Sequence, residues 1–147
     1  MMAWKSQVDY GKDWDHKSRI EDKFMSKSGN SRWHVYHGTA YHFDIWSNIH
    51  YGYVGRSIGF KNDLLLDGAG LAQFKHDLNY DFPPKSTGES SGWRQWDHPE
   101  DRGAISAGVD LYSQHPAGVT VELLLQLVFN TKGLATMPAK KVTPSTP

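Results

Sequence analysis

Helical spacing is clearest in residues 44–60, which read DIWSNIHYGYVGRSIGF. Ile45, Ile49 and Tyr53 recur every fourth residue, and this spacing predicts an apolar stripe along a helix. A neighbouring face of that helix carries Asp44, Asn48, Tyr51, Gly52, Gly55 and Gly59. Glycine weakens a helix by about 1 kcal/mol relative to alanine. Glycines aligned on one face therefore indicate close approach of another backbone or of a ligand.

Three more helices are predicted after this one. The first covers residues 64–78, where Asp63 is the expected N-cap and leucines recur every seven residues. It is followed by residues 79–96, which are rich in Pro, Ser and Gly and are predicted to form a long loop. The last helix covers about residues 119–130. That segment is the most apolar in the chain, so it is expected to lie at the centre of the core.

The remaining helix is predicted to begin just after the long loop and to run to about residue 113. Asp97 is its expected N-cap, Pro99 falls in the first turn, and Glu100 occupies the capping-box position. Capping by itself accounts for Asp97 and Glu100, whereas it accounts for neither His98 nor Asp101. The last two are therefore the more informative residues of this segment.

The sequence predicts a mostly α fold. Residues 32–43, RWHVYHGTAYHF, are aromatic and rich in histidine, and they are predicted to form a short hairpin or an extended segment. We therefore expect one compact domain of about four helices over residues 1–137, with a small irregular or hairpin segment near residues 32–41. Residues 138–147 contain Lys, Thr and Pro without apolar periodicity, and a disordered tail is expected there.

The composition limits the chemistry. With 16 Lys+Arg and 16 Asp+Glu, the formal net charge is +0, so no overall field favours a polyanion such as nucleic acid. The chain has no cysteine, which excludes disulfides and a thiol nucleophile. Its 6 Trp, 7 Tyr and 6 Phe are suited to stacking on sugars or bases. No apolar run reaches the roughly 20 residues of a membrane span, and the segment MMAWKS lacks the apolar core of a signal peptide.

Two groups of carboxylates are candidates for acid–base chemistry. Asp44, Asn48 and Tyr51 place a carboxylate, an amide and a phenol along one strip of the predicted helix. A carboxyl group among aromatic side chains is a candidate general acid. The alternative is that Asp44 caps the helix and Tyr51 packs in the core. The second group is DHPED, residues 97–101, which could hold a metal or supply a second catalytic acid.

Motifs for cofactors are missing. His34 and His37 are spaced too loosely to predict a zinc site, and no HExxH motif occurs. The glycines of YGYVGRSIGF fit neither GxxxxGKS/T nor GxGxxG, so no phosphate-binding loop is predicted. We therefore expect no metal and no cofactor.

Four motifs occur in order along the chain. They are WDHK at 14–17, DxxxNIHYGYVG at 44–55 with GF at 59–60, LxxxAGxAQ at 65–73, and DxPxD at 97–101 with IxxG at 105–108. In this order and spacing they resemble the polymorphic toxin type 44 domains, found at the ends of bacterial secreted toxins and in phage-related proteins. The resemblance runs from about Trp4 to Tyr112. It implies a mostly α fold, a toxic and hydrolytic activity, delivery into a target cell or secretion, and a cognate immunity protein as partner.

The neutral charge, the abundant aromatic residues and the two carboxylate groups favour a glycan substrate. The preferred hypothesis is an antibacterial hydrolase acting on peptidoglycan, muramidase-like, with Asp44 and Asp101 as the catalytic acid and the base or nucleophile. The residues expected to bind substrate are Asn48, Tyr51, Gln73, Asp97 and His98.

Two alternatives remain at this point. The first is a nuclease toxin that uses His98 or His16 as acid and base, with Lys17 or Arg102 on the phosphate. Its weakness is the missing excess of positive charge. The second is a binding module without enzymatic activity, in which the motifs only pack and cap helices.

Overall fold

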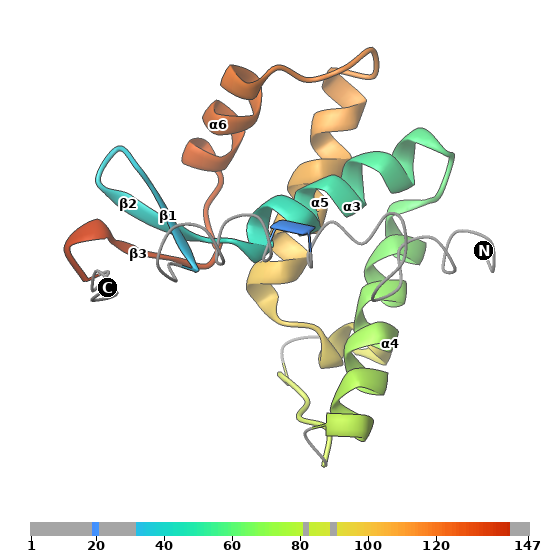
Figure 1. Cartoon of the computed structure of the whole chain (residues 1–147). Coiled ribbons are helices and arrows are strands. Elements are labelled where there is room, and N and C mark those ends of the chain that lie inside the picture. Colours follow the sequence, from blue (N-terminus) through green and yellow to red (C-terminus); the bar gives the residue numbers. More distant parts are fainter. Residues whose placement is uncertain (1–18, 21–31, 81–82, 89–90, 142–147) are drawn as a thin grey trace. The chain divides into compact units, whose positions relative to one another are not determined.

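The structure is a computed structural model that describes residues 19–20, 32–80, 83–88 and 91–141 (Figure 1). The chain forms two compact units. The helical unit comprises residues 48–134, and the strand unit comprises residues 1–47 and 135–147. Along the described ranges, no helix is both long and apolar enough to cross a membrane.

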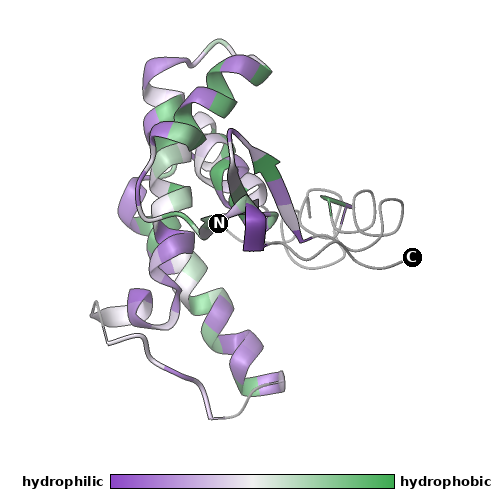
Figure 2. Ribbon diagram, turned by 90° about the vertical axis from the view of Figure 1, so that its left-hand side faces the viewer, coloured by the Kyte–Doolittle hydropathy of each residue, from purple (hydrophilic) through white to green (hydrophobic). Residues whose placement is uncertain are grey.

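Four helices of ten residues or more account for most of the described chain, as the sequence predicts. Helix α3 begins in the strand unit and continues into the helical unit, whereas the others lie within the helical unit. These elements are α3 (Asp44–Ser57), α4 (Asn62–Tyr80), α5 (Pro99–Gln114) and α6 (Val121–Asn130). A short 3-10 helix, η1 (Gly92–Trp96), interrupts the predicted loop between α4 and α5. In Figure 2 the helices carry hydrophobic residues beside hydrophilic ones, the pattern of partly exposed helices.

Helices α3 and α5 cross with their backbones in contact. A Cβ atom added at Gly52 would collide with the carbonyl oxygen of Ile105, and one added at Gly108 would collide with that of Ile49. The close approach predicted from the glycine face is therefore confirmed at Gly52. Gly55 instead lies against the side chain of Leu65, on helix α4.

The core of the helical unit lies around α5 and not around α6. Leu65, Ile105 and Val109 form the buried cluster, against which partly buried side chains of α3 and α4 pack. The expected central position of α6 is wrong, because Val128 is its only buried residue and Val121 is 66% exposed. An apolar composition gives a helix only a tendency to be buried. The small residues of α5, such as Gly108, allow α3 to approach closely, and the core forms at that contact.

The helix starts differ from the predicted caps. Helix α5 begins at Pro99, so His98 is its N-cap, and no side-chain cap hydrogen bond forms there. Asp97 instead is the C-cap of η1, and its backbone N–H donates to the carbonyl of Arg94. Asp63 lies inside the first turn of α4, which begins one residue earlier than its predicted cap. Both predicted caps are wrong. Asn62 already begins α4, and Trp96 ends a 3-10 helix that the local sequence pattern does not predict.

The strand unit contains a three-stranded antiparallel sheet of order β1-β2-β3. Strands β1 (Trp33–Tyr36) and β2 (Thr39–His42) form the hairpin expected near residues 32–41, and both turn residues between them have a positive φ. Strand β3 (Thr136–Pro138) pairs with β2 and is followed by the 3-10 helix η2 (Ala139–Lys141). Residues 138–141 of the expected disordered tail therefore have regular structure, while residues 142–147 lie outside the described ranges. Pairing with a distant strand supplies order that the tail composition does not predict.

Candidate functional site

A buried carboxyl group lies at the junction of η1 and α5. Asp97 is only 4% exposed, and its Oδ2 atom has no hydrogen-bond partner among the described residues. Burial, followed by repulsion from Asp101, raises the pKa of the Asp97 carboxyl from 3.8 to about 7. The charges of Arg102 and His98 act in the opposite direction. Asp97 therefore keeps its proton to a higher pH than an ordinary carboxyl group does, which is the property a general acid requires.

The second carboxylate, Asp101, lies in the first turn of α5 and is partly exposed. The Asn48 side-chain amide donates from α3 to Asp101 Oδ1 over 2.6 Å. A hydrogen bond to a charged acceptor is stronger than a neutral one and fixes the orientation of the carboxylate. The structure thus brings together two residues that the sequence placed in separate motifs, and it places Asp97 beside them.

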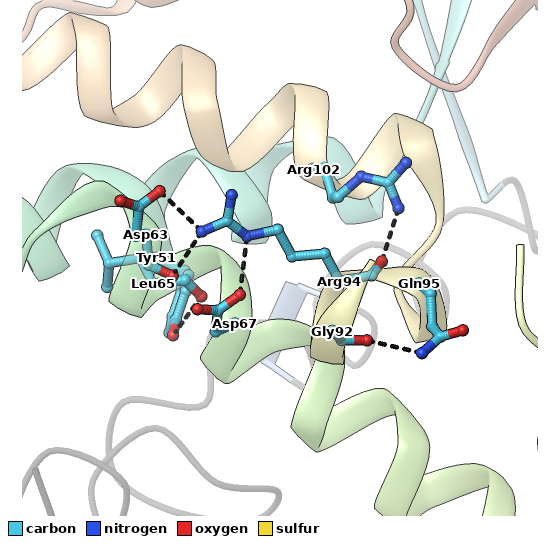
Figure 3. A network of polar contacts seen from close by, with 8 residues as sticks. All are labelled: Tyr51, Asp63, Leu65, Asp67, Gly92, Arg94, Gln95 and Arg102. Atoms are coloured by element: carbon cyan, nitrogen blue, oxygen red, sulfur yellow. Dashed lines mark hydrogen bonds and ion pairs between the residues drawn. The ribbon is translucent and has the colours of Figure 1, made fainter. Parts of the chain in front are cut away.

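Two arginines hold η1 in place between α4 and α5 (Figure 3). Arg94 donates from Nε to Asp67 over 2.8 Å and from Nη2 to Asp63 over 2.7 Å. Arg102 Nη1 donates to the carbonyl of Arg94 over 2.8 Å and to the carbonyl of Asp97 over 2.6 Å. The backbone that carries Asp97 is therefore tied to both neighbouring helices.

Close packing reinforces these ties. A Cβ atom at Gly70 of α4 would collide with the carbonyl group of Trp93 in η1. Beside this contact, the Phe74 ring lies 5.7 Å from the Trp93 ring and 4.9 Å from the Trp96 ring. Gly70, in the AG pair at 69–70, thus has a structural reason: it lets the backbone of η1 approach α4 closely.

Two of the other residues expected to bind substrate, Tyr51 and Gln73, have hydrogen-bond partners inside the helical unit. The Tyr51 hydroxyl donates to the Leu65 carbonyl over 3.3 Å, and Gln73 Nε2 donates to Asp77 Oδ1 over 2.6 Å. His98 is exposed, next to the site carboxyls. A role of these three side chains in substrate binding stays a prediction.

Asp44 belongs to the strand unit. Its Oδ2 atom lies 3.6 Å from Nδ1 of His42, and it is the first residue of α3. Nearby in that unit, Trp46 Nε1 donates to His34 Nδ1 over 2.8 Å, and burial followed by the charge of His42 lowers the pKa of His34. Asp101 belongs to the other unit, so a catalytic pair of Asp44 and Asp101 stays a prediction.

Sequence reasoning missed the special position of Asp97 because capping explained that residue too easily. The signal that could have revealed it is the tryptophan-rich GWRQW segment directly before it, which predicts an apolar environment. His16 and Lys17, which the nuclease alternative requires, lie outside the described residues.

A comparison with protein families identifies the class to which this helical fold and its carboxyl groups belong. The family model described as bacterial toxin 44 matches residues 3–114, which include Asn48, Asp97 and Asp101. The protein is therefore a toxin-type effector domain. It belongs to the bacterial toxin 44 family, as its four motifs indicate. No curated protein and no solved structure gives a significant match.

Membership of this family has consequences for partners and delivery. Toxins of this type are consistent with secretion or with delivery into target cells. The family also suggests an immunity protein as partner.

Proposed function

We propose that this toxin is a hydrolase of the peptidoglycan glycan, with Asp97 as general acid and Asp101 as base or nucleophile. The observation that carries the proposal is the buried Asp97 carboxyl, with a pKa of about 7, beside an Asp101 carboxylate oriented by Asn48. Paired carboxyl groups with different environments are the machinery of most glycosidases.

The chemical step follows from these two roles. Asp97 donates its proton to the glycosidic oxygen while the bond from that oxygen to the anomeric carbon breaks. Asp101 either attacks the anomeric carbon or removes a proton from the attacking water. If Asp101 attacks, water then breaks the bond between Asp101 and the anomeric carbon and gives its proton to the Asp97 carboxylate. If Asp101 acts as base, the oxygen of the attacking water bonds to the anomeric carbon directly. In both cases the Asp97 proton stays on the leaving sugar. Asp97 thus takes the acid role that the sequence offered to Asp44.

The charges of the site support a glycan over a nucleic acid. Arg94 is paired with two carboxylates, and Arg102 donates to two backbone carbonyls. The charge of Arg94 is therefore already matched by carboxylates, whereas a nuclease draws much of its affinity from cations that contact phosphates.

The experiment gives the full chain purified peptidoglycan, and in parallel a mixture of RNA and DNA, with and without EDTA. We expect soluble muropeptides from peptidoglycan regardless of EDTA, none from Asp101→Asn, and normal release from Glu100→Gln, a carboxylate change in the same helical turn. Cleavage of nucleic acid that His98→Ala abolishes, with peptidoglycan left intact, would overturn the proposal in favour of a nuclease.

A further inference from the structure

A tryptophan stands exposed beside the proposed site. Trp93 of η1 is 46% exposed, although indole is among the most apolar of side chains. It contacts Phe74 in an edge-on arrangement, with the ring planes at 62°. In an edge-to-face contact the edge of one ring meets the face of the other, so Phe74 covers at most one face of the indole. An exposed aromatic ring of this size is a surface that a ligand can cover.

The segment that carries Trp93 is held firmly. The Trp93 carbonyl packs against Gly70, and the next residue, Arg94, is anchored by two ion pairs. On the other side, Gln95 Nε2 donates to the carbonyl of Gly92 over 2.9 Å, and the Thr87 N–H donates to the carbonyl of Gln95 over 2.7 Å. A ring on a fixed backbone loses little conformational entropy when a ligand stacks on it.

Trp93 also lies at a useful distance from the acid. A 3-10 helix rises about 2 Å per residue, so Trp93 and Trp96, the last residue of η1, are about 6 Å apart along the axis, and Asp97 follows directly in extended backbone. That separation is comparable to one or two sugar units of a chain. A polymer bound at Asp97 can therefore reach the Trp93 ring with a neighbouring unit.

From these observations we infer that Trp93 is the stacking platform of a glycan subsite adjoining Asp97 and Asp101. The inference rests on the proposed function, because it takes the same polymer as ligand. The chemistry is stacking of the apolar C–H face of an N-acetylhexosamine ring on the indole face. Sugar is favoured over a nucleobase because the adjacent cation, Arg94, is already neutralised by Asp63 and Asp67.

The test measures binding separately from cleavage. The probe is a soluble oligomer of N-acetylglucosamine, titrated by calorimetry into the full-length Asp101→Asn protein so that turnover cannot interfere. Adding Trp93→Ala should weaken the affinity by about tenfold or more, since aromatic stacking and its buried area contribute about that factor. Trp93→Phe should restore part of the affinity. Phe129→Ala is the matched control, because Phe129 is 52% exposed but lies on α6, and it should change nothing.

The outcomes separate the two proposals. Equal affinity of the Trp93→Ala and parent proteins, or no binding of the oligomer at all, overturns the subsite. The subsite is also overturned if Trp93→Ala weakens the binding of a single-stranded RNA but leaves the affinity for the sugar oligomer unchanged. The two proposals can also fail separately. If Trp93→Ala lowers the affinity for the sugar oligomer but the parent protein leaves peptidoglycan intact, the subsite is supported and the proposed hydrolysis is overturned. Melting curves of each variant show whether the loss reflects unfolding.

Discussion

The Asn48 side-chain amide donates a 2.6 Å hydrogen bond to Asp101, and thereby connects helix α3 to the first turn of helix α5. The two residues lie 53 positions apart in the chain. This bond orients the carboxylate that the proposed mechanism uses as base or nucleophile. It depends on the glycine-mediated crossing of the same two helices, so fold and site share one structural basis.

Asn48→Ala should lower peptidoglycan cleavage about 10- to 100-fold, because a hydrogen bond to a charged group contributes about 1.5–3 kcal/mol. Asn48→Asp should be worse, since it places a further carboxylate against Asp101. Rates of muropeptide release measure both effects. Activity of Asn48→Asp equal to that of the parent would show that the bond does not orient a catalytic group.

Asp97→Asn should abolish activity and yet stabilise the protein above pH 7. The folded pKa of about 7 exceeds the reference value of 3.8, so the contribution of Asp97 to the stability of the parent is most favourable below pH 4 and is lost as pH rises to 7. Three pKa units correspond to about 4 kcal/mol of unfolding free energy, which the parent loses when the buried Asp97 carboxyl ionises. Asparagine cannot ionise, so the variant does not lose it. Urea unfolding at pH 4 and pH 8 measures this difference. A variant that is less stable than the parent at pH 8 would point to a structural role instead.

Arg102 should set the pH range of the enzyme. Its charge lowers the pKa of Asp97, so Arg102→Gln should raise that pKa and move the alkaline limb of the kcat/KM profile above pH 7. Arg102→Lys keeps the charge and should keep the limb close to that of the parent, even though it loses hydrogen bonds to the η1 carbonyls. Identical profiles for the glutamine and lysine variants would contradict an electrostatic effect.

Gly52→Ala should destabilise the fold by about 1–3 kcal/mol or more, because the added methyl group meets the backbone of α5. Gly103→Ala is the matched control within α5. There a Cβ atom would make only an ordinary contact of 3.5 Å with the Gly133 carbonyl oxygen, so the change should be neutral or stabilising by up to about 1 kcal/mol. Thermal melts compare the two, and equal melting temperatures would argue against the close crossing.

Asp44→Asn should lower activity by less than about tenfold, whereas Asp101→Asn should remove it. The reason is that the proposed acid is Asp97, while Asp44 begins α3 and lies next to His42. A loss as complete as that of Asp101→Asn, with an unchanged melt, would return Asp44 to the acid role that the sequence favoured.

The sequence by itself determined the helices, the hairpin and the family. Apolar residues four apart predict α3, the aromatic segment at 32–43 predicts a short hairpin or an extended stretch, and four spaced motifs identify the toxin family. These are local patterns, so a short window of sequence contains the information. The glycines of α3 also predicted a close contact, because glycine in a helix has a cost that only a neighbour offsets.

Only the tertiary structure decided the place of Asp97, its neighbours and the core. Asp97 looked like a cap, but in the folded chain it is buried at the junction of η1 and α5, and burial raises the pKa of its carboxyl group. The bond from Asn48 to Asp101 joins distant segments, and the apolar helix α6 proved peripheral. The burial of a side chain and its hydrogen-bond partners depend on which surfaces come into contact after folding. A sequence pattern predicts which residues tend to be buried, but not which of them come into contact.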